Sequence, residues 1–311
     1  MIKRVRGAII SMHKAAYLAL FIKLIRPLTL IIDYFVVRIF PIDNMTNNLQ
    51  PCLMIVSPPR SGSTIIYQVL VSIIPSSYIS NYHALFPRCG KYLNKNTSYY
   101  KHNLSNYYGY TSQMKGVYEG NELLDKIIEI EDINELRQKF ITFIRGLGEN
   151  SSLPIIFKNV RAYKYIYKLH LAVPELKFLF VERDNAKTIQ SVLNAYRELG
   201  GFHPIPENMK DVSFNDPIEY SVKQILEIKR NINEQKSKIS IKNVFNVTYE
   251  EFCNNTWDIV QNIAQNALYV SPDKLHKEGK NIKLKMSTVN KSKNTEENEI
   301  SKLLKIYGKP H

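Results

Sequence analysis

Short runs of consecutive apolar residues alternate with longer stretches of helical spacing along most of this 311-residue chain. Four runs have the length and apolar character of strands that are buried on both faces. They are Leu53–Val56, Pro154–Lys158, Leu176–Glu182 and Val244–Val247. Strands buried on both faces are typical of parallel sheets, whose crossover connections are usually helices. The pattern therefore predicts an α/β fold with a central parallel sheet of about five strands flanked by helices.

Apolar residues at intervals of three and four predict the helices that would cover this sheet. Helices are expected over Ser63–Ile74, within Glu122–Gly146, over Tyr163–Ala172, from about Ala186, and over Pro217–Lys236, Trp257–Leu268 and Glu296–Tyr307. The segment Tyr163–Ala172 joins two predicted strands, as in a βαβ unit. Two loops are also predicted. Gly90–Gly120 is rich in tyrosine, asparagine and serine and has the length of a lid or binding loop, and Asn281–Asn294 is basic.

An apolar stretch at residues 8–40 follows a cationic start and precedes the first predicted strand. Five charged residues interrupt it, namely Lys14, Lys23, Arg26, Asp33 and Arg38, and Pro27 splits it. No window reaches the ~20 uninterrupted apolar residues of a clean spanning helix. Three alternatives stay open: an interfacial or monotopic anchor, a helix packed on the main domain or a partner, and a transmembrane helix of a type II protein. We expect residues 1–50 to form this extension and its linker, and residues 51–311 to form the main domain.

The chain carries a formal net charge of +14 and has a pI near 9.4. This charge suits a phosphate-rich ligand or an acidic surface, although a composition rich in lysine, asparagine and isoleucine also produces it. No basic–aromatic motif points to nucleic acid. The three cysteines are scattered, which fits a reducing compartment, and no histidine–cysteine spacing predicts a metal site. We expect a cytoplasmic or peripherally membrane-associated protein. The oligomeric state stays open.

The polar segment Ser57–Thr64 joins the first predicted strand to the first predicted helix. Pro58 and Pro59 end the strand, because proline supports neither ladder bonding nor a helix at these positions. A helix N-terminus after a tight loop offers amide groups and the positive end of the helix dipole to an anion. Gly62 permits close approach of that anion, and Arg60 adds a fixed positive charge. Hydroxyl donors come from Ser61, Ser63 and Thr64.

This loop differs from the phosphate loop of kinases, which reads Gly-x-x-x-x-Gly-Lys-Ser/Thr. Ser57 stands in place of the first glycine, and Ser63 stands in place of the lysine that contacts the β- and γ-phosphates. A nucleotide kinase with a degenerate loop is therefore the weaker alternative. The string Pro-Arg-Ser-Gly-Ser-Thr instead resembles the 5′-phosphosulfate loop of sulfotransferases that use 3′-phosphoadenosine 5′-phosphosulfate (PAPS). It is most similar to the carbohydrate, tyrosyl-protein and bacterial branches.

A second strand-to-helix junction carries Arg183 and, eight residues later, Ser191. An i and i+8 pair lies about 80° apart around a helix axis, so both side chains can face one phosphate. The pair resembles the 3′-phosphate site of the same family, although Asn185 replaces the usual proline. There the arginine supplies a charge-assisted fork and the serine a hydroxyl group. The resemblance implies a P-loop-like three-layer domain in which Pro59–Thr64 hold the 5′-phosphosulfate and Arg183 and Ser191 hold the 3′-phosphate.

Lys158 ends the strand that precedes the Arg183 strand. The family carries a lysine at the corresponding strand end, and it resembles a transition-state stabiliser that points at the sulfuryl group. The same role is implied for Lys158, with Arg60 as a further cation beside the transferred group.

The general base is less clearly indicated. The tyrosyl-protein branch has glutamates, one of them catalytic, at positions that fall on Asn81 and Tyr82, and this chain has no carboxylate there. His83 is the nearest group that accepts a proton at neutral pH. We therefore expect His83 to act as the base, with Glu119 from the next loop as the alternative.

The resemblance covers roughly residues 52–270. It implies metal-independent transfer of a sulfuryl group from PAPS to a hydroxyl acceptor. A carbohydrate, a lipid or another small molecule is the expected acceptor, rather than a protein tyrosine, and residues 8–40 are the candidate contact with a membrane surface. The alternative from another functional class is a non-catalytic, membrane-bound anion-binding or scaffold protein with the same fold.

Overall fold

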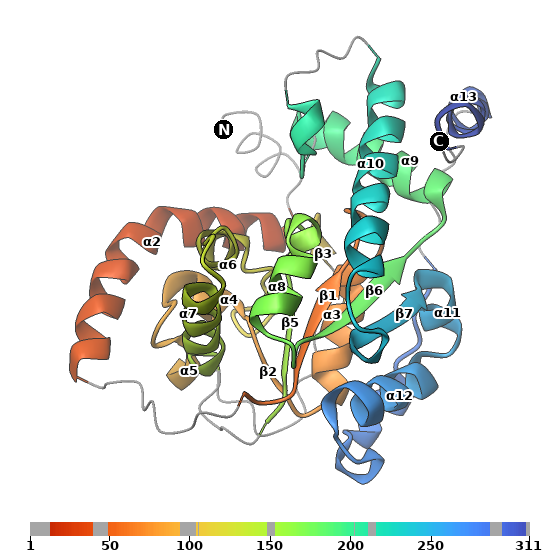
Figure 1. Ribbon diagram of the computed structural model, residues 1–311. Helices are drawn as coiled ribbons and strands as arrows, with labels where there is room; N and C mark the ends of the chain where they lie inside the picture. The colour runs from red at the N-terminus through yellow and green to blue at the C-terminus, as the bar shows by residue number, and fades with distance from the viewer. Residues whose placement is uncertain are drawn as a thin grey trace.

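Five parallel strands form the central sheet, in the order β2-β5-β1-β6-β7. The computed structural model describes residues 13–39, 49–93, 104, 106–147, 153–201, 203–210, 216–286 and 294–308. The strands are β1 (Cys52–Val56), β2 (Ser77–Tyr78), β5 (Ile155–Lys158), β6 (Lys177–Glu182) and β7 (Val244–Thr248). The predicted fold class, a P-loop-like α/β domain with helices around a parallel sheet, is confirmed (Figure 1). Only β2 was not predicted, because two residues are too short to give a readable apolar run.

Helices cover both faces of the sheet, and alternate residues of β1 contribute to the two cores. Leu53 and Ile55 pack with α3 (Ser63–Ile73), α11 (Tyr249–Asn254) and α12 (Thr256–Leu268). Met54 and Val56 pack on the other side with α6 (Asn121–Ile128), α7 (Ile133–Arg145), α8 (Ile166–Ala172) and α10 (Pro217–Ser237). A central strand that is apolar at every position is therefore buried on both faces, as the sequence predicts.

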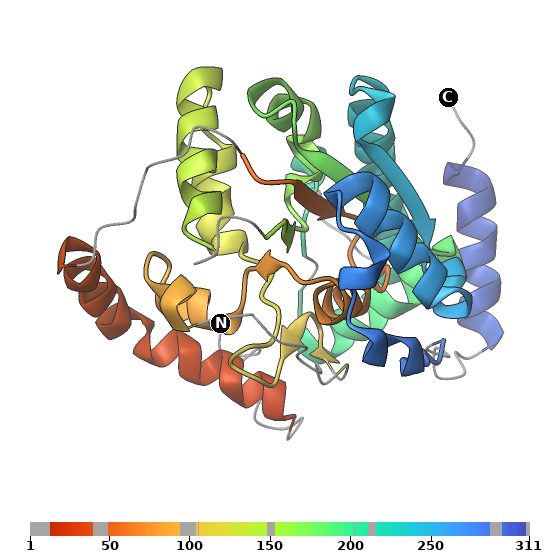
Figure 2. The same ribbon diagram turned by 90° about the horizontal axis from the view of Figure 1, so that it is seen from below.

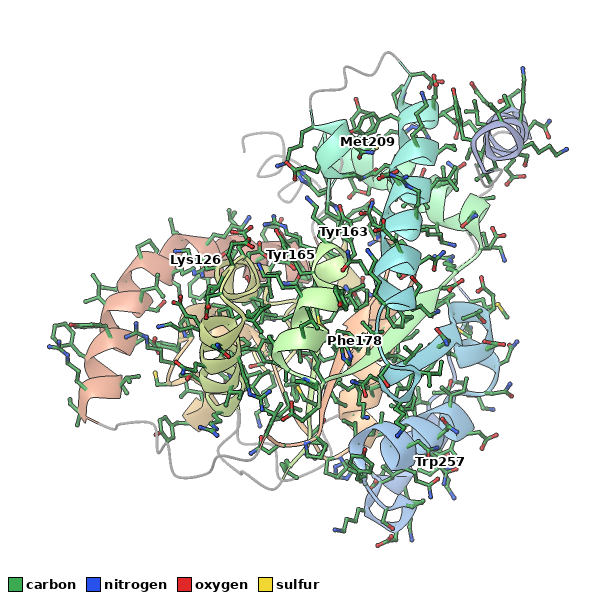
Figure 3. The ribbon with its side chains drawn as sticks, viewed as in Figure 1. Lys126, Tyr163, Tyr165, Phe178, Met209 and Trp257 are labelled. Carbon is green, nitrogen blue, oxygen red and sulfur yellow. The ribbon has the colours of Figure 1, made fainter. Side chains whose placement is uncertain are left out.

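A third apolar cluster lies beyond the sheet, where α9 (Asn185–Leu199) and α13 (Asn294–Tyr307) pack against α10. Figure 3 shows Met209 in this region, well separated from Phe178 on β6 and from Trp257 on α12. The cluster packs α9, the helix that carries Ser191, against α10 and α13.

The parallel register brings the carboxyl ends of three neighbouring strands, β5, β1 and β6, to the same end of the sheet. Ile55 of β1 pairs with Lys158 of β5, and Val56 of β1 pairs with Phe180 of β6. The segments that follow these strands therefore begin next to one another. This carboxyl end of the sheet carries the loop after β1, the end of β5 and Arg183 after β6. Open parallel sheets bind ligands outside the carboxyl ends of their strands.

The N-terminal apolar stretch forms one helix, α2 (Lys14–Ile39), which passes through Pro27 without a break. The expectation that Pro27 splits the stretch was wrong. Proline normally interrupts a helix because it lacks an N–H group and crowds the preceding turn. Here Ile22 and Thr29, on either side of Pro27, are both buried against the domain, and the Thr29 hydroxyl donates to the Arg26 carbonyl at 3.0 Å. Packing on both sides of the proline holds the helix together.

The segment after β2, which includes much of the predicted Gly90–Gly120 loop, contains short elements. The segment after β2 forms α4 (Asn81–Leu85), α5 (Gly90–Leu93) and a hairpin of β3 (Asn106–Tyr107) and β4 (Tyr110–Thr111). The predicted basic loop is described only up to residue 286, so Lys291 and Lys293 lie outside the described residues, as do residues 40–48 of the predicted linker. Figure 2 shows α2 along the outside of the molecule, with one end beside the hairpin.

Candidate active site

The loop after β1 is built to bring backbone close to a ligand. Gly62 occupies the N-cap position of α3 with a left-handed φ of 83°, and a Cβ atom there would lie 2.2 Å from the ring of Tyr249. Arg60 is also left-handed, with φ 66°, a strained conformation that is concentrated at functional sites. The Ser57 and Ser63 hydroxyl groups bond to each other at 2.8 Å across the loop. These contacts fix a tight turn directly before the helix.

This turn fits a bound anion. Gly62 has no side chain to cap the amide groups in the first turn of α3, and the positive end of the helix dipole lies at the same place. The Ser61 hydroxyl is buried and has no hydrogen-bond partner within the described part of the chain. Pro59 is buried beside it and contributes rigidity rather than a donor. An unsatisfied buried hydroxyl beside uncapped amides is what a phosphate oxygen would satisfy.

Replacing Gly62 with alanine is expected to damage the loop. The alanine methyl group would strain a left-handed backbone and collide with the Tyr249 ring, so we expect a loss of about 1–3 kcal/mol of stability. Chemical denaturation measures this loss. Gly146→Ala is the matched control, because Gly146 has a negative φ of −71°. Equal stability of the two variants would show that the loop does not depend on this conformation.

Three predicted site residues lie together at the carboxyl end of the sheet: Arg60, Arg183 and Ser191. The Arg60 Nε donates to the Ser191 hydroxyl at 3.1 Å, and the Arg183 Nη1 donates to the Arg60 carbonyl at 3.2 Å. Arg183 is only 7% exposed, and its guanidinium lies 4.9 Å from the centre of the Tyr249 ring. The two sequence motifs, 123 residues apart, therefore form one site. We assigned Arg60 to the 5′-phosphosulfate loop, but its side chain extends from that loop to Ser191, which belongs to the predicted 3′-phosphate site.

Burial lowers the pKa of Arg60, and the nearby charge of Arg183 lowers it further, against the opposing effects of Tyr108, Glu119 and Glu198. Two guanidinium groups brought together in a poorly solvated place repel each other. A bound anion removes this repulsion and forms charge-assisted hydrogen bonds with both groups. The pair of poorly solvated cations therefore favours an anionic ligand.

Lys158 forms the second part of the site with Glu119 and Thr64. Its side chain is 3% exposed, and its ammonium group pairs with the Glu119 carboxylate, which is 18% exposed. The Lys158 Nζ also donates to the Thr64 hydroxyl at 3.3 Å. Thr64 lies in the first turn of α3, so this ion pair adjoins the loop after β1. The structure brings the predicted stabilising lysine together with the second of the two predicted bases.

The β3–β4 hairpin covers this arrangement, which the sequence did not predict in detail. The Arg60 guanidinium lies 4.8 Å from the centre of the Tyr108 ring. Tyr107 donates to Glu198 of α9 at 2.8 Å, and Tyr108 hydrogen-bonds to the same carboxylate. A Cβ atom on Gly109 would lie 3.0 Å from the Glu119 Oε1. The tyrosine-rich composition indicated a binding loop, but Glu198 had no local signal that would single it out.

His83 occupies a different environment. It is fully buried in α4, where its Nδ1 accepts from the Ser80 amide at 3.1 Å in a capping box. A Cβ atom on Gly90 would lie 3.0 Å from its ring. Among the described residues, no hydrogen bond links His83 to the loop, to Lys158 or to Glu119. This geometry is that of a structural histidine and does not bring His83 to the predicted site.

His83 should make stability pH-dependent. Burial lowers its pKa to about 4, so the unfolded chain, with a histidine pKa of about 6.5, binds this proton more tightly. The stabilisation is therefore present above about pH 6.5 and lost as the pH falls to 4, by about 3 kcal/mol. His83→Gln keeps an acceptor for the cap and removes the titration. As the pH is lowered, we expect the denaturation midpoint of this variant to fall less steeply than that of the wild type. Parallel pH profiles of the two proteins would show that burial does not lower the pKa of His83.

Comparisons with known proteins identify the family and the fold. A model described as the sulfotransferase family matches residues 51–267. Two bacterial sulfotransferase structures share the fold: STF9 from Mycobacterium avium and STF1 from Mycobacterium tuberculosis H37Rv. The first is 12% identical with a TM-score of 0.55, covering 90% of this chain and 74% of the other. The second is 12% identical with a TM-score of 0.52, covering 89% and 77%. No curated protein matches the chain significantly. Because the family model spans most of the domain, the chain belongs to the sulfotransferase family.

Proposed function

We propose that this protein transfers a sulfuryl group from PAPS to a hydroxyl acceptor. The observation that carries the proposal is the junction of Arg60, Arg183 and Ser191, joined by hydrogen bonds of 3.1 and 3.2 Å at the end of the sheet. It supplies two cations and a hydroxyl beside a helix N-terminus. A nucleotide with anionic groups at both its 3′ and 5′ positions is the ligand that such a divided anion site fits.

Each end of the nucleotide has its own set of donors. The amide groups at the start of α3 and the hydroxyl groups of Ser61, Ser63 and Thr64 hold the 5′-phosphosulfate. Arg183 and Ser191 hold the 3′-phosphate, and Arg60 lies between the two sets, with its backbone in the loop and its side chain against Ser191. The unsatisfied Ser61 hydroxyl supports this fit.

The chemical step needs one proton acceptor and one cation at the transferred group. The acceptor oxygen forms a bond to sulfur, the bond between sulfur and the 5′-phosphate oxygen breaks, and adenosine 3′,5′-bisphosphate leaves. Lys158 stabilises the negative charge that develops on the departing oxygen. Positioning and charge stabilisation account for most of the catalysis in such in-line transfers.

Glu119 is the better candidate for the general base. A carboxylate accepts a proton directly, and that of Glu119 lies within hydrogen-bonding distance of Thr64 in the loop and pairs with Lys158. His83 would have to leave its cap and its enclosed position to do the same. The proposal therefore assigns the proton of the acceptor hydroxyl to Glu119 rather than to His83.

Calorimetric titration with adenosine 3′,5′-bisphosphate, compared with ATP and magnesium, tests the ligand class. We expect saturable binding of the bisphosphate alone. Binding of ATP with magnesium, without binding of the bisphosphate, would favour the nucleotide-kinase alternative. Transfer is then measured with radiolabelled PAPS and a panel of carbohydrate, lipid and phenolic acceptors. Tight binding without any transfer would favour the non-catalytic alternative.

A further inference from the structure

The outward face of α2 carries a continuous apolar stripe. Its six side chains are between 43% and 78% exposed: Tyr17, Phe21, Leu24, Leu28, Ile31 and Phe35. They follow one another at intervals of four and three residues, which places them on one side of the helix. Exposed apolar surface of this extent on one element marks an interaction site rather than ordinary protein surface.

The inward face holds α2 against the domain. Ala15, Ala16 and Ile22 are buried, and the helix packs on α4 and on the β3–β4 hairpin. Asp33 is 2% exposed and accepts hydrogen bonds from the amide groups of Arg88 at 3.1 Å and Cys89 at 2.8 Å. The contacts extend from the first turn of the helix to its last third, so α2 is docked along its length.

Length and composition alone would let α2 cross a membrane. A spanning orientation, however, would remove the inward face from the domain and carry Asp33 into lipid without the amide groups that satisfy it. It would also break the ion pair between Arg26 and Glu122 of α6. Charged groups in the hydrocarbon region are costly. A docked α2 can therefore meet a bilayer only with its axis parallel to the surface.

The charges on α2 identify the partner. Asp33, its only acidic residue, points inward, whereas the exposed charged residues Lys14, Lys23 and Arg38 are all cations. The preceding segment adds Lys3, Arg4 and Arg6, and the chain as a whole carries +14. Pairing of two copies through this face would bring cations together. Apolar side chains flanked by cations instead match an anionic lipid surface.

We propose that the outward face of α2 is a docking surface for an anionic lipid bilayer, on which the helix lies in the plane of the membrane. The surface comprises the six-residue apolar stripe and the flanking cations Lys23 and Arg38. The first turn of α2 also packs on Tyr107 of the hairpin that covers the candidate active site. A docked protein therefore holds that hairpin about one helix diameter, roughly 10 Å, from the lipid.

Co-sedimentation with vesicles tests the surface without depending on enzymatic activity. The full-length protein is expected to bind vesicles of phosphatidylcholine and phosphatidylserine more tightly than vesicles of phosphatidylcholine alone. The double variant Leu24→Ser, Leu28→Ser should weaken binding at least about tenfold, because each of the two leucines of the wild type buries an apolar side chain in lipid. Lys23→Ser and Arg38→Ser should each weaken binding to the anionic vesicles about fivefold. Ile241→Ser, which removes an exposed isoleucine outside α2, is the matched control. Unchanged melting temperatures exclude misfolding.

Depth measurements separate a helix lying in the plane from one that spans. Phe21→Trp, Leu28→Trp and Phe35→Trp are made singly in a Trp257→Phe background, and quenching by brominated lipids is compared. Equal quenching at the three positions is expected for an in-plane helix. Strong quenching only at position 28 would overturn the proposal in favour of a spanning helix. Absence of vesicle binding together with a stable dimer that dissociates in the Leu24→Ser, Leu28→Ser variant would assign the face to a second copy instead.

Discussion

Replacing Arg183 with alanine is expected to weaken the binding of adenosine 3′,5′-bisphosphate about 10²- to 10³-fold. The substitution removes a buried guanidinium, 7% exposed, that is held between the Arg60 carbonyl and the Tyr249 ring. If this group binds the 3′-phosphate, adenosine 5′-monophosphate should hardly distinguish the variant from the wild type, because it lacks that phosphate. Calorimetric titration with both nucleotides measures, for each of them, the ratio of the dissociation constants of the variant and the wild type.

Two further variants separate a specific contact from a general loss of charge. Arg183→Lys keeps the charge but loses the planar fork, so its affinity should lie between those of the wild type and the alanine variant. Arg230→Ala removes an arginine on the outside of α10 that pairs with Glu227, and it should leave both affinities unchanged. Equal losses for the two nucleotides in Arg183→Ala would show that Arg183 supports the loop and does not bind the 3′-phosphate.

The sheet and the tight turn after β1 could be predicted because the signals for them are local. Buried parallel strands require apolar runs, and β1, β5 and β6 lie where such runs occur, whereas the edge strand β7 is only partly buried and is interrupted by Asn246. A polar turn between a strand and a helix, with Gly62 at its end, needs no knowledge of distant residues. The meeting of Arg60 with Arg183 followed from the same local facts once the strands were placed side by side.

The partners of these residues could not be predicted in the same way. Tyr249 packs against Gly62 and Arg183 only because β7 lies next to β6. Glu119 and Glu198 come from distant elements. Their proximity to the loop depends on tertiary packing, which apolar periodicity does not encode.

The choice between His83 and Glu119 as the general base illustrates the difference between local sequence signals and tertiary packing. Proximity in sequence to Asn81 favoured His83, because side-chain chemistry can be read from a sequence whereas solvent access cannot. In the structure, Asn81 donates to the Gln113 carbonyl at 2.8 Å and His83 completes the cap of the same helix. Both positions stabilise α4, and the carboxylate near the loop comes from the segment that follows the hairpin.

Replacing Glu119 with glutamine is expected to lower kcat about 10²- to 10⁴-fold while the binding of adenosine 3′,5′-bisphosphate survives. Glutamine has nearly the same shape and retains an oxygen that accepts from Lys158 and Thr64, but it does not accept a proton from the acceptor hydroxyl. Single-turnover transfer from radiolabelled PAPS measures the chemical step, and calorimetry measures nucleotide binding. Loss of both together would indicate a collapsed site rather than a missing base.

His83→Gln is the matched comparison, because it removes the other candidate base with the same kind of substitution. The variant should keep most of its turnover at neutral pH, since a histidine with a pKa near 4 that lies buried in a helix cap has no access to the acceptor. The two variants are therefore expected to differ: Glu119→Gln loses turnover, whereas His83→Gln keeps turnover and changes the dependence of stability on pH. A reversed pattern, with turnover lost only in His83→Gln, would return the role of base to the histidine and would require α4 to open during the reaction.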